Sequence, residues 1–414
     1  MSSVQKLGLR ELQDAVTGSA AAFRCRRRLQ PAGGKGDKVF PPTYEGAQYA
    51  TEDRVVNEEG KPVRVSCVLL DSVQSQANRM ELALLEATRE QKIQVPLVEV
   101  DFGKANLPEV GKITSLEAPH RLADAILRDS VLDGKKFRET EDGKTLDSAS
   151  VANATGLFGL CPTALVFGLW DSTGPRGGLG TKFQRVLVSE IVGIMCVSGV
   201  KPSSRIDPLG IELSAGPLYR TGDGSWTPNP EEAAKGVDGQ PEKLGKEGKP
   251  SEANHGNVTP SLKDKNGRPH HGGVTLDHVL QTVVISLPAI RRLRFPVQRK
   301  NESETDPVAR TCIAALGLCA AALSISKGCD LRSRCLLVPE PGQASWELIN
   351  GDGTVLAFDL TACEACKLLE DTVATAVAAG LPWRKEALVL TPSDGLAALV
   401  RKSREIAMQT TESE

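Results

Sequence analysis

The chain has 414 residues, of which 40% are hydrophobic and 25% charged, and its formal net charge at pH 7 is -2. This length and composition fit a globular protein with a large core, built as two or three domains or as one elaborated domain. A nearly neutral chain has no global basic field, so any nucleic-acid contact has to come from local basic patches.

No N-terminal stretch has the pattern of a secretory signal, and the longest apolar run, residues 312–325, is too short to span a bilayer. We therefore expect a cytoplasmic protein with no membrane partner. The ten cysteines fit a reducing compartment, in which most of them are buried thiols.

The first half of the chain mixes strand and helix patterns. Alternating apolar residues predict a strand over 63–70, and apolar residues at helical spacing predict a helix over 71–90, capped by Asp71 with Gln74. An amphipathic pattern with an early proline predicts another helix over 119–132. The short apolar run 163–170 is rich in strand formers and predicts a strand. The next run, 183–197, fits a helix and a strand equally.

The second half continues this mixture. Residues 275–287 and 354–360 have strand patterns, and Asp306 followed by Pro307 predicts the start of a buried helix that ends at Gly328. Three further elements are expected near the end: a helix from the capping box of Thr361 and Glu364 to Gly380, a strand over 386–392 and a helix over 393–407. Strands and helices mixed throughout favour an α+β or α/β fold.

Two stretches are basic and one is poor in apolar residues. Residues 24–38 and 291–300 concentrate arginine and lysine, and the first stretch reads as a terminal arm that is either solvated or bound to a polyanion. Residues 221–273 are rich in glycine and proline. They predict a flexible insertion, a long loop or mobile hairpin rather than a domain.

Residues 171–183, DSTGPRGGLGTKF, form a glycine-rich loop after the predicted strand. A Walker loop needs lysine directly after its last glycine, and a dinucleotide fingerprint needs a third glycine where Phe183 stands, so both nucleotide motifs fail. The remaining interpretations are a tight structural turn or a grip on phosphate by backbone amides and flanking cations. We favour the phosphate grip, whose residues are Gly174, Arg176, Gly177, Gly178, Gly180, Lys182 and Arg185.

Asp171 opens this loop and has two interpretations. Its carboxylate could hold a metal for RNA cleavage, or it could cap the loop's own amides, which we favour. The CxxC of Cys363 and Cys366 lies inside a predicted helix without a second ligand pair, so we interpret it as buried thiols. No cofactor and no metal site is expected.

Six stretches together resemble one protein family. They are FPPTYEGAQYATEDR (40–54), LLDSVQSQANRMELAL (69–84), APHRLADAILRDS (118–130), CPTALVFGLWDSTGPRGGLGTKFQRVLVSEIVG (161–193), SRIDPLGI (204–211) and ISLPAIRRLRFP (285–296). In this order they resemble the backbone subunit of the type I-G (formerly I-U) CRISPR Cascade effector complex, a member of the RAMP superfamily. The block at 161–193 is the most specific.

The resemblance implies an α+β fold, a modified RNA-recognition-motif (ferredoxin-like) palm with finger and thumb insertions. It divides the chain into a basic arm and lead-in (1–60), a first palm part with helical insertions (61–220), the flexible insertion (221–273) and the rest of the palm with C-terminal helices (274–414). It also implies a non-catalytic role in antiviral defence. Copies would stack as a helical filament along the spacer of a CRISPR RNA and present it for pairing with target DNA. The expected partners are CRISPR RNA, target DNA through guide pairing, other copies of the chain and other subunits of this ribonucleoprotein.

The residues expected to bind RNA come from the family-like stretches. The polar start of the helix after residue 71 resembles a helix that related subunits place against guide RNA, and its exposed face should carry Gln74, Ser75, Gln76, Asn78 and Arg79. The residues of the glycine-rich loop listed above are also expected to bind RNA. Four further candidates are chosen for their positive charge within the family-like blocks: Arg54, Arg291, Arg292 and Arg294. Two other function classes stay open: a metal-dependent ribonuclease that uses Asp171, and a protein scaffold that binds no RNA.

Overall fold

The computed structural model describes residues 5–58, 60–173, 180–236, 238–263, 267, 271–298, 300–341 and 345–412. It divides into two compact units. The first comprises Met1–Val197 and Thr275–Ala397, and the second comprises Ser198–Val274 and Ala398–Glu414. Helices and strands occur in both halves of the chain, so the predicted α+β class is confirmed.

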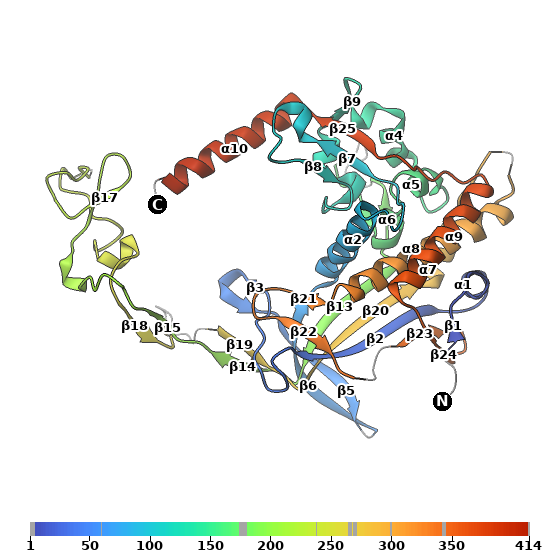
Figure 1. Cartoon of the computed structure of the whole chain (residues 1–414), viewed down its shortest axis with the longest axis horizontal. Coiled ribbons are helices and arrows are strands. Elements are labelled where there is room, and N and C mark those ends of the chain that lie inside the picture. Colours follow the sequence, from blue (N-terminus) through green and yellow to red (C-terminus); the bar gives the residue numbers. More distant parts are fainter. Residues whose placement is uncertain are drawn as a thin grey trace. The chain divides into compact units, whose positions relative to one another are not determined.

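A large sheet forms the base of the first unit (Figure 1). Its strands lie in the order β1-β24-β23-β2-β20-β13-β6-β5, and β22 pairs with β2 and with β21 beside this path. Their bounds are β1 (Gln5–Lys6), β2 (Ala22–Pro31), β5 (Thr51–Glu58), β6 (Lys61–Asp71), β13 (Leu187–Ile194), β20 (His278–Ser286), β21 (Cys329–Asp330), β22 (Leu336–Pro339), β23 (Ser345–Ile349) and β24 (Val355–Asp359).

Four of these strands have ferredoxin-like topology. Numbered along the chain as β2, β13, β20 and β23, they lie in the order four, one, three, two, and each neighbouring pair is antiparallel. The helix α2 (Val73–Arg89) precedes the second strand, and α8 (Glu302–Ser326) joins the third to the fourth. This is the β-α-β-β-α-β pattern. The hairpin of β5 and β6, inserted before α2, widens the sheet beyond β13.

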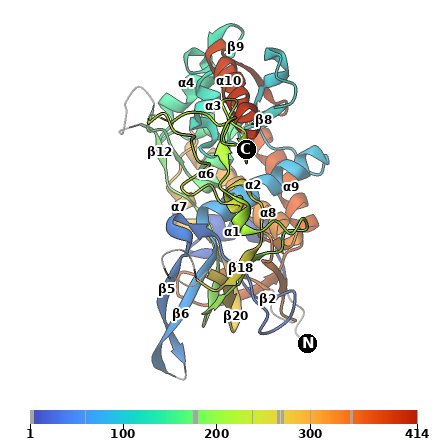
Figure 2. The same cartoon turned by 90° about the vertical axis from the view of Figure 1, so that its left-hand side faces the viewer.

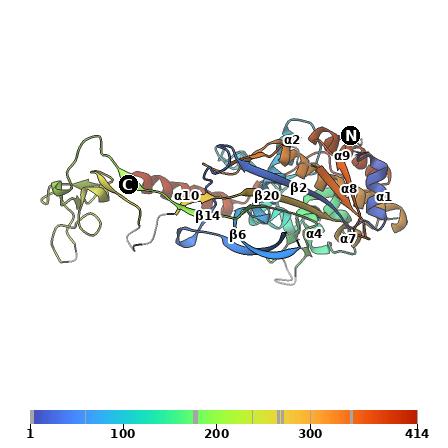
Figure 3. The same cartoon turned by 90° about the horizontal axis from the view of Figure 1, so that it is seen from below.

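The helix α8 is the centre of the core. It packs against β20 and against the helices α1 (Leu9–Thr17), α2, α6 (Thr163–Phe167), α7 (Leu287–Arg291) and α9 (Ala362–Ala378). Figures 1 and 3 show α8 and α9 side by side along the sheet. By length and composition α8 is apolar enough to cross a membrane, but 78% of its apolar window is buried inside the protein. A core helix has this character, because it is covered on every side.

A smaller sheet lies at the end of the first unit away from β5 and β6 (Figure 2). Its order is β10-β9-β25-β7-β8, so the late strand β25 is inserted between two early ones. The bounds are β7 (Val98–Asp101), β8 (Lys112–Thr114), β9 (Ser130–Leu132), β10 (Lys135–Lys136) and β25 (Leu388–Pro392), with the short helices η3 (Arg121–Ala123), α3 (Ala125–Arg128), η4 (Phe137–Glu139), α4 (Glu141–Ser148), α5 (Thr155–Leu160) and α6 (Thr163–Phe167) nearby.

The predicted helix over 119–132 is wrong. The segment breaks into η3, α3 and β9, because Arg121 has a φ of 53° and Asp124 caps a new helix by accepting a hydrogen bond from the Ile126 amide. The predicted strand over 163–170 is also wrong. Residues 163–167 form α6, which Gly168 ends with a φ of 85°. Both runs are short, and for short runs tertiary contacts override local propensity.

The basic stretch that begins at residue 24 is not a terminal arm. Residues 22–31 form β2, between β20 and β23 in the sheet. The run 183–197, which fitted helix and strand equally, forms β13 over 187–194. The helix expected to start at Asp306 begins earlier, at Glu302. The carboxylate of Asp306 instead accepts hydrogen bonds from the Phe295 amide and from two arginines.

The second unit consists of short antiparallel pairs. They are β14 (Val197–Val200) with β19 (His271–Thr275), β15 (Ser203–Arg205) with β18 (Val258–Ser261), and β16 (Tyr219–Arg220) with β17 (Trp226–Thr227). Residues 221–273 belong to this unit. The turn helices η6 (Leu213–Ala215) and η7 (Pro250–Ala253) and part of α10 (Asp394–Glu412) also belong to it. The buried carboxylate of Asp207 joins its turns by accepting hydrogen bonds from the Leu209 and Gly256 amides.

Candidate nucleic-acid interface

A buried polar network fixes the start of α2. Asp71, at the end of β6, is 1% exposed, and its Oδ2 accepts hydrogen bonds from Gln76 Nε2 at 2.6 Å and Arg79 Nε at 3.0 Å. Arg79 also donates to the Leu331 carbonyl at 2.7 Å. The cap of α2 is Ser72, whose hydroxyl accepts from the Ser75 amide, and not the predicted Asp71.

Gln76 continues this network into the sheet. Its Oε1 accepts from Ser189 Oγ at 2.9 Å and from Gln281 Nε2 at 3.0 Å, and Arg27 donates to Gln281 Oε1 at 2.8 Å. The side chain of Gln76 is 1% exposed. Its predicted place on the exposed helix face is therefore wrong, because the amide is needed to satisfy buried polar groups.

The exposed part of α2 borders a hollow of about 430 Å³. Gln74 and Asn78 of α2 are exposed and line it, and the predicted cations Lys182 and Arg185 line it from another part of the chain. The remaining lining residues are Ala77, Pro119, His120, Arg121, Phe167, Gly168, Leu169, Trp170 and Phe183. We call this hollow the α2 groove. It unites four predicted RNA-binding residues that are distant in sequence.

Trp170 and Lys182 form one wall of the α2 groove. They face each other across the antiparallel pair of β11 (Leu169–Trp170) and β12 (Lys182–Phe183). The Lys182 Nζ lies 5.5 Å from the centroid of the indole ring, which is cation–π distance. Trp170 is 55% exposed. An exposed indole beside a lysine offers a stacking face and a positive charge to the same nucleotide.

A buried ion pair supports this wall from beneath. Arg121, 6% exposed, donates to both carboxylate oxygens of Glu81 of α2, at 2.6 and 2.8 Å, and also to the Gly168 carbonyl at 3.0 Å. Burial raises the pKa of Glu81 to about 7, although Arg121 opposes the shift. Arg185 donates to the Phe167 carbonyl at 3.2 Å, and burial lowers its pKa. These bonds fix the turn at Gly168 that leads into Trp170.

Three other predicted cations, Arg54, Arg291 and Arg294, have internal partners. Arg54 of β5 pairs with Glu190 at 2.9 Å and Glu52 at 2.5 Å, and the hydrogen bond to Glu190 raises its pKa. Arg294 pairs with Asp306 at 2.7 Å.

Arg291 donates to three carbonyls at the end of α1, those of Ala15, Val16 and Ala20. The neighbouring Arg292 is exposed. Arg54, Arg291 and Arg294 therefore hold the fold together in this structure, and none of these three or Arg292 lines the α2 groove.

The glycine-rich loop lies largely outside the described residues, which omit Gly174, Arg176, Gly177 and Gly178. Gly180, at the described end of the loop, is half-buried.

Asp171 is 3% exposed and pairs with Arg138 at 2.8 Å, and its amide donates to the Thr181 carbonyl. Among the described residues its carboxylate accepts no hydrogen bond from a backbone amide; the side chain makes the ion pair with Arg138 instead. Among these residues, no group of three histidines, cysteines or acids is placed to hold a metal ion.

Sequence reasoning missed two residues of the α2 groove, Trp170 and His120. His120 stands alone in the sequence, and only the fold brings it next to α2. Trp170 had a usable signal, because the chain has few aromatic residues and this one directly precedes a glycine-rich loop that we expected to bind phosphate.

Part of the chain matches a known protein family. Residues 23–197 fit the model of a family described as CRISPR-associated protein GSU0053 (Cas_GSU0053). No curated protein matches the chain significantly. The matched region runs from β2 to just past β13 and includes every residue of the α2 groove. The chain is similar in this region to that family, and the match indicates a CRISPR-associated protein.

Proposed function

We propose that the chain is a non-catalytic, CRISPR-RNA-binding backbone subunit of the type I-G Cascade complex. Copies of it stack along the guide spacer and present the guide for pairing with target DNA in the cytoplasm. The match to a CRISPR-associated family supports the general role. The ferredoxin-like sheet fits the palm that the family resemblance implies.

The α2 groove is the observation that carries this proposal. It combines an exposed indole with the cation Lys182 and the polar side chains Gln74 and Asn78. Stacking on an aromatic ring contributes about 1–3 kcal/mol per base and tolerates every base, because each base has a π-face. A lysine contacts phosphate without regard to sequence. Together they suit binding of single-stranded RNA with little sequence preference, and guide pairing then supplies the specificity.

Asp171 has a structural partner that weighs against the ribonuclease alternative. Its carboxylate is buried and its charge is balanced by Arg138, which also pairs with Asp147 at 2.5 Å. A metal bound at Asp171 would have to displace this arginine. We therefore propose that the subunit has no nuclease activity of its own. Incubation of the assembled complex with target RNA and Mg²⁺ should leave the RNA intact, and Asp171→Ala should not change that result.

RNA binding by the groove can be measured by fluorescence anisotropy of a labelled, unstructured RNA. Trp170→Ala should weaken binding by roughly 5- to 150-fold, the equivalent of about 1–3 kcal/mol. Trp170→Phe should recover most of the affinity, because the ring still stacks. Trp226→Ala, which removes an exposed tryptophan of the second unit, is the matched control and should bind normally.

The salt dependence separates RNA binding from the scaffold alternative. Contacts to phosphate release counterions, so the affinity should fall steeply as salt rises, and Lys182→Ala should reduce that slope. Unchanged affinity in both Trp170→Ala and Lys182→Ala would remove the groove from the proposal. A purified protein that binds no RNA at low salt would remove the RNA-binding role altogether.

A further inference from the structure

Two thiols meet where the central helix α8 packs against α9. Cys319 of α8 donates a hydrogen bond to the sulfur of Cys366 of α9, with the two Sγ atoms 3.8 Å apart. The residues are 47 positions apart in sequence, so the tertiary fold alone brings them together. A disulfide has an S–S length of about 2.05 Å. The sulfurs thus need to approach by less than 2 Å to become bonded.

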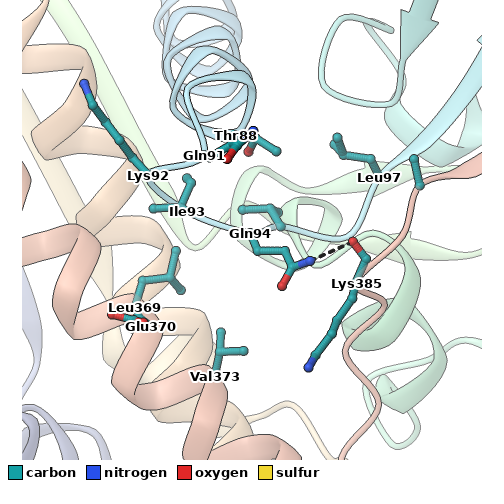
Figure 4. A pocket seen from close by; sticks show the side chains of 12 residues that line it. Thr88, Gln91, Lys92, Ile93, Gln94, Leu97, Leu369, Glu370, Val373 and Lys385 are labelled. Carbon is teal, nitrogen blue, oxygen red and sulfur yellow. Dashed lines mark hydrogen bonds between the residues drawn. The ribbon is translucent and has the colours of Figure 1, made fainter.

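The two thiols differ in their access to solvent. Cys319 is buried, whereas Cys366 is partly exposed. Cys366 and three residues of α9, Leu369, Glu370 and Val373, recur at helical spacing and so share one face of the helix. Those three residues line a pocket of about 510 Å³ together with Lys92 (Figure 4). Cys366 lies one turn before this pocket wall, and its partial exposure leaves its side chain accessible to a small molecule.

The surroundings of Cys366 favour its thiolate, which is the reactive form. The hydrogen bond donated by Cys319 lowers the pKa of Cys366, and the positive charge of Lys92 acts in the same direction. The same hydrogen bond and burial raise the pKa of Cys319. The more accessible thiol is therefore also the better nucleophile. The prediction that both thiols of the CxxC are buried is wrong, because Cys363 is exposed and Cys366 is partly exposed.

We propose that Cys366 and Cys319 form a reactive dithiol that a low-molecular-weight disulfide oxidises to a disulfide between α8 and α9. The Cys366 thiolate attacks one sulfur of the small disulfide, forms a mixed disulfide and releases one thiolate, which takes up a proton. Cys319 then loses its proton to solvent and attacks the Cys366 sulfur. The second small thiolate leaves, and the internal disulfide is complete. The protein loses two electrons and two protons, and the small disulfide becomes two thiols.

The product is a covalent bond across the core. The contact between α8 and α9 is the main packing contact of α9 with the centre of the first unit. Closing a loop of this length restricts the unfolded chain, so the oxidised protein should unfold at a higher temperature. Neither cysteine lines the α2 groove, so this inference and the RNA-binding proposal can fail independently.

Oxidised glutathione is a suitable probe for the full-length protein, with remaining thiols alkylated before mass spectrometry. We expect the protein to lose the mass of two hydrogen atoms, a cross-linked peptide whose fragmentation joins Cys319 to Cys366, and an upward shift of Tm that dithiothreitol reverses. Cys363→Ser should still form the bond, whereas Cys366→Ser and Cys319→Ser should not. A bond between Cys363 and Cys366, a glutathione adduct that persists on Cys366, or an unchanged mass of the wild-type protein would each overturn the proposal.

Discussion

Replacing Arg121 by methionine should destabilise the first unit and disturb the α2 groove. Arg121 makes three hydrogen bonds, two to Glu81 and one to the Gly168 carbonyl, and its guanidinium lies 5.4 Å from the centroid of the Phe167 ring. Methionine fills a similar volume but leaves Glu81, 2% exposed, without its partner. Removing one member of a buried ion pair costs about 3–5 kcal/mol, because the remaining carboxyl group is left buried without its partner and either carries an unpaired charge or has to take up a proton.

The pH dependence follows from the direction of the Glu81 shift. Burial raises the pKa of Glu81 to about 7, so the folded protein holds this proton more tightly than the unfolded chain does. The resulting stability is complete below the ordinary pKa of glutamate and is lost as the pH rises through about 7. Arg121 opposes the shift, so its removal raises the pKa of Glu81 further. The stability of Arg121→Met should thus keep falling above pH 7, and its deficit against wild type should be larger at pH 8 than at pH 6.

Urea denaturation at both pH values measures this prediction. Arg89→Met is a matched control, because Arg89 pairs with Glu86 on the exposed face of the same region and should change stability by less than about 1 kcal/mol. The double variant Glu81→Leu with Arg121→Met should recover most of the stability, since an apolar pair replaces a buried ionic one at little cost. If the double variant is less stable than Arg121→Met, or if the deficit is larger at pH 6, the reasoning about this pair is refuted.

Two further predictions concern the ends of helices. Thr361→Ala removes the hydroxyl that accepts from the Glu364 amide at the start of α9 and should cost about 1 kcal/mol in urea unfolding. Ser148→Ala, at the exposed last residue of α4, where the hydroxyl donates to the Thr145 carbonyl and caps no amide, should change stability less. Gly168→Ala places a Cβ 3.0 Å from Arg185 Cγ at a φ of +85°. This substitution should therefore lower Tm and weaken RNA binding together. A variant with normal Tm and normal binding would show that this turn does not set the position of Trp170.

The junction of β6 and α2 was predictable from the sequence, because the apolar residues alternate before residue 71 and recur at helical spacing after it. The capping box of Thr361 and Glu364 was predictable for a similar reason: both of its hydrogen bonds are local. The strand β2 was not. Its arginines alternate with Phe23, Cys25 and Leu29, but Arg27 stands at an inward position, where its guanidinium bonds to Gln281, a residue distant in sequence.

The α2 groove was half predictable. Its polar and basic members carry chemistry that is visible in the sequence, and four of them were expected to bind RNA. Its aromatic member depends on the break between α6 and β11, and that break depends on the turn at Gly168. Arg121 and Arg185 hold this turn from other segments of the chain. The residues around Gly168 alone therefore do not predict the turn.

The buried bonds at the start of α2 give the groove its rigidity. Gln76 and Arg79 point into the protein and bind Asp71, while Gln74 and Asn78 lie exposed on the same helix beside the groove. The inward residues tie the helix to β6, β13 and β20. The entropic cost of ordering this helix is therefore met when the protein folds and not when a ligand binds. If the chain is the repeated, guide-binding subunit that we propose, such a preformed surface lets it bind many different sequences, because no single base contact has to organise it.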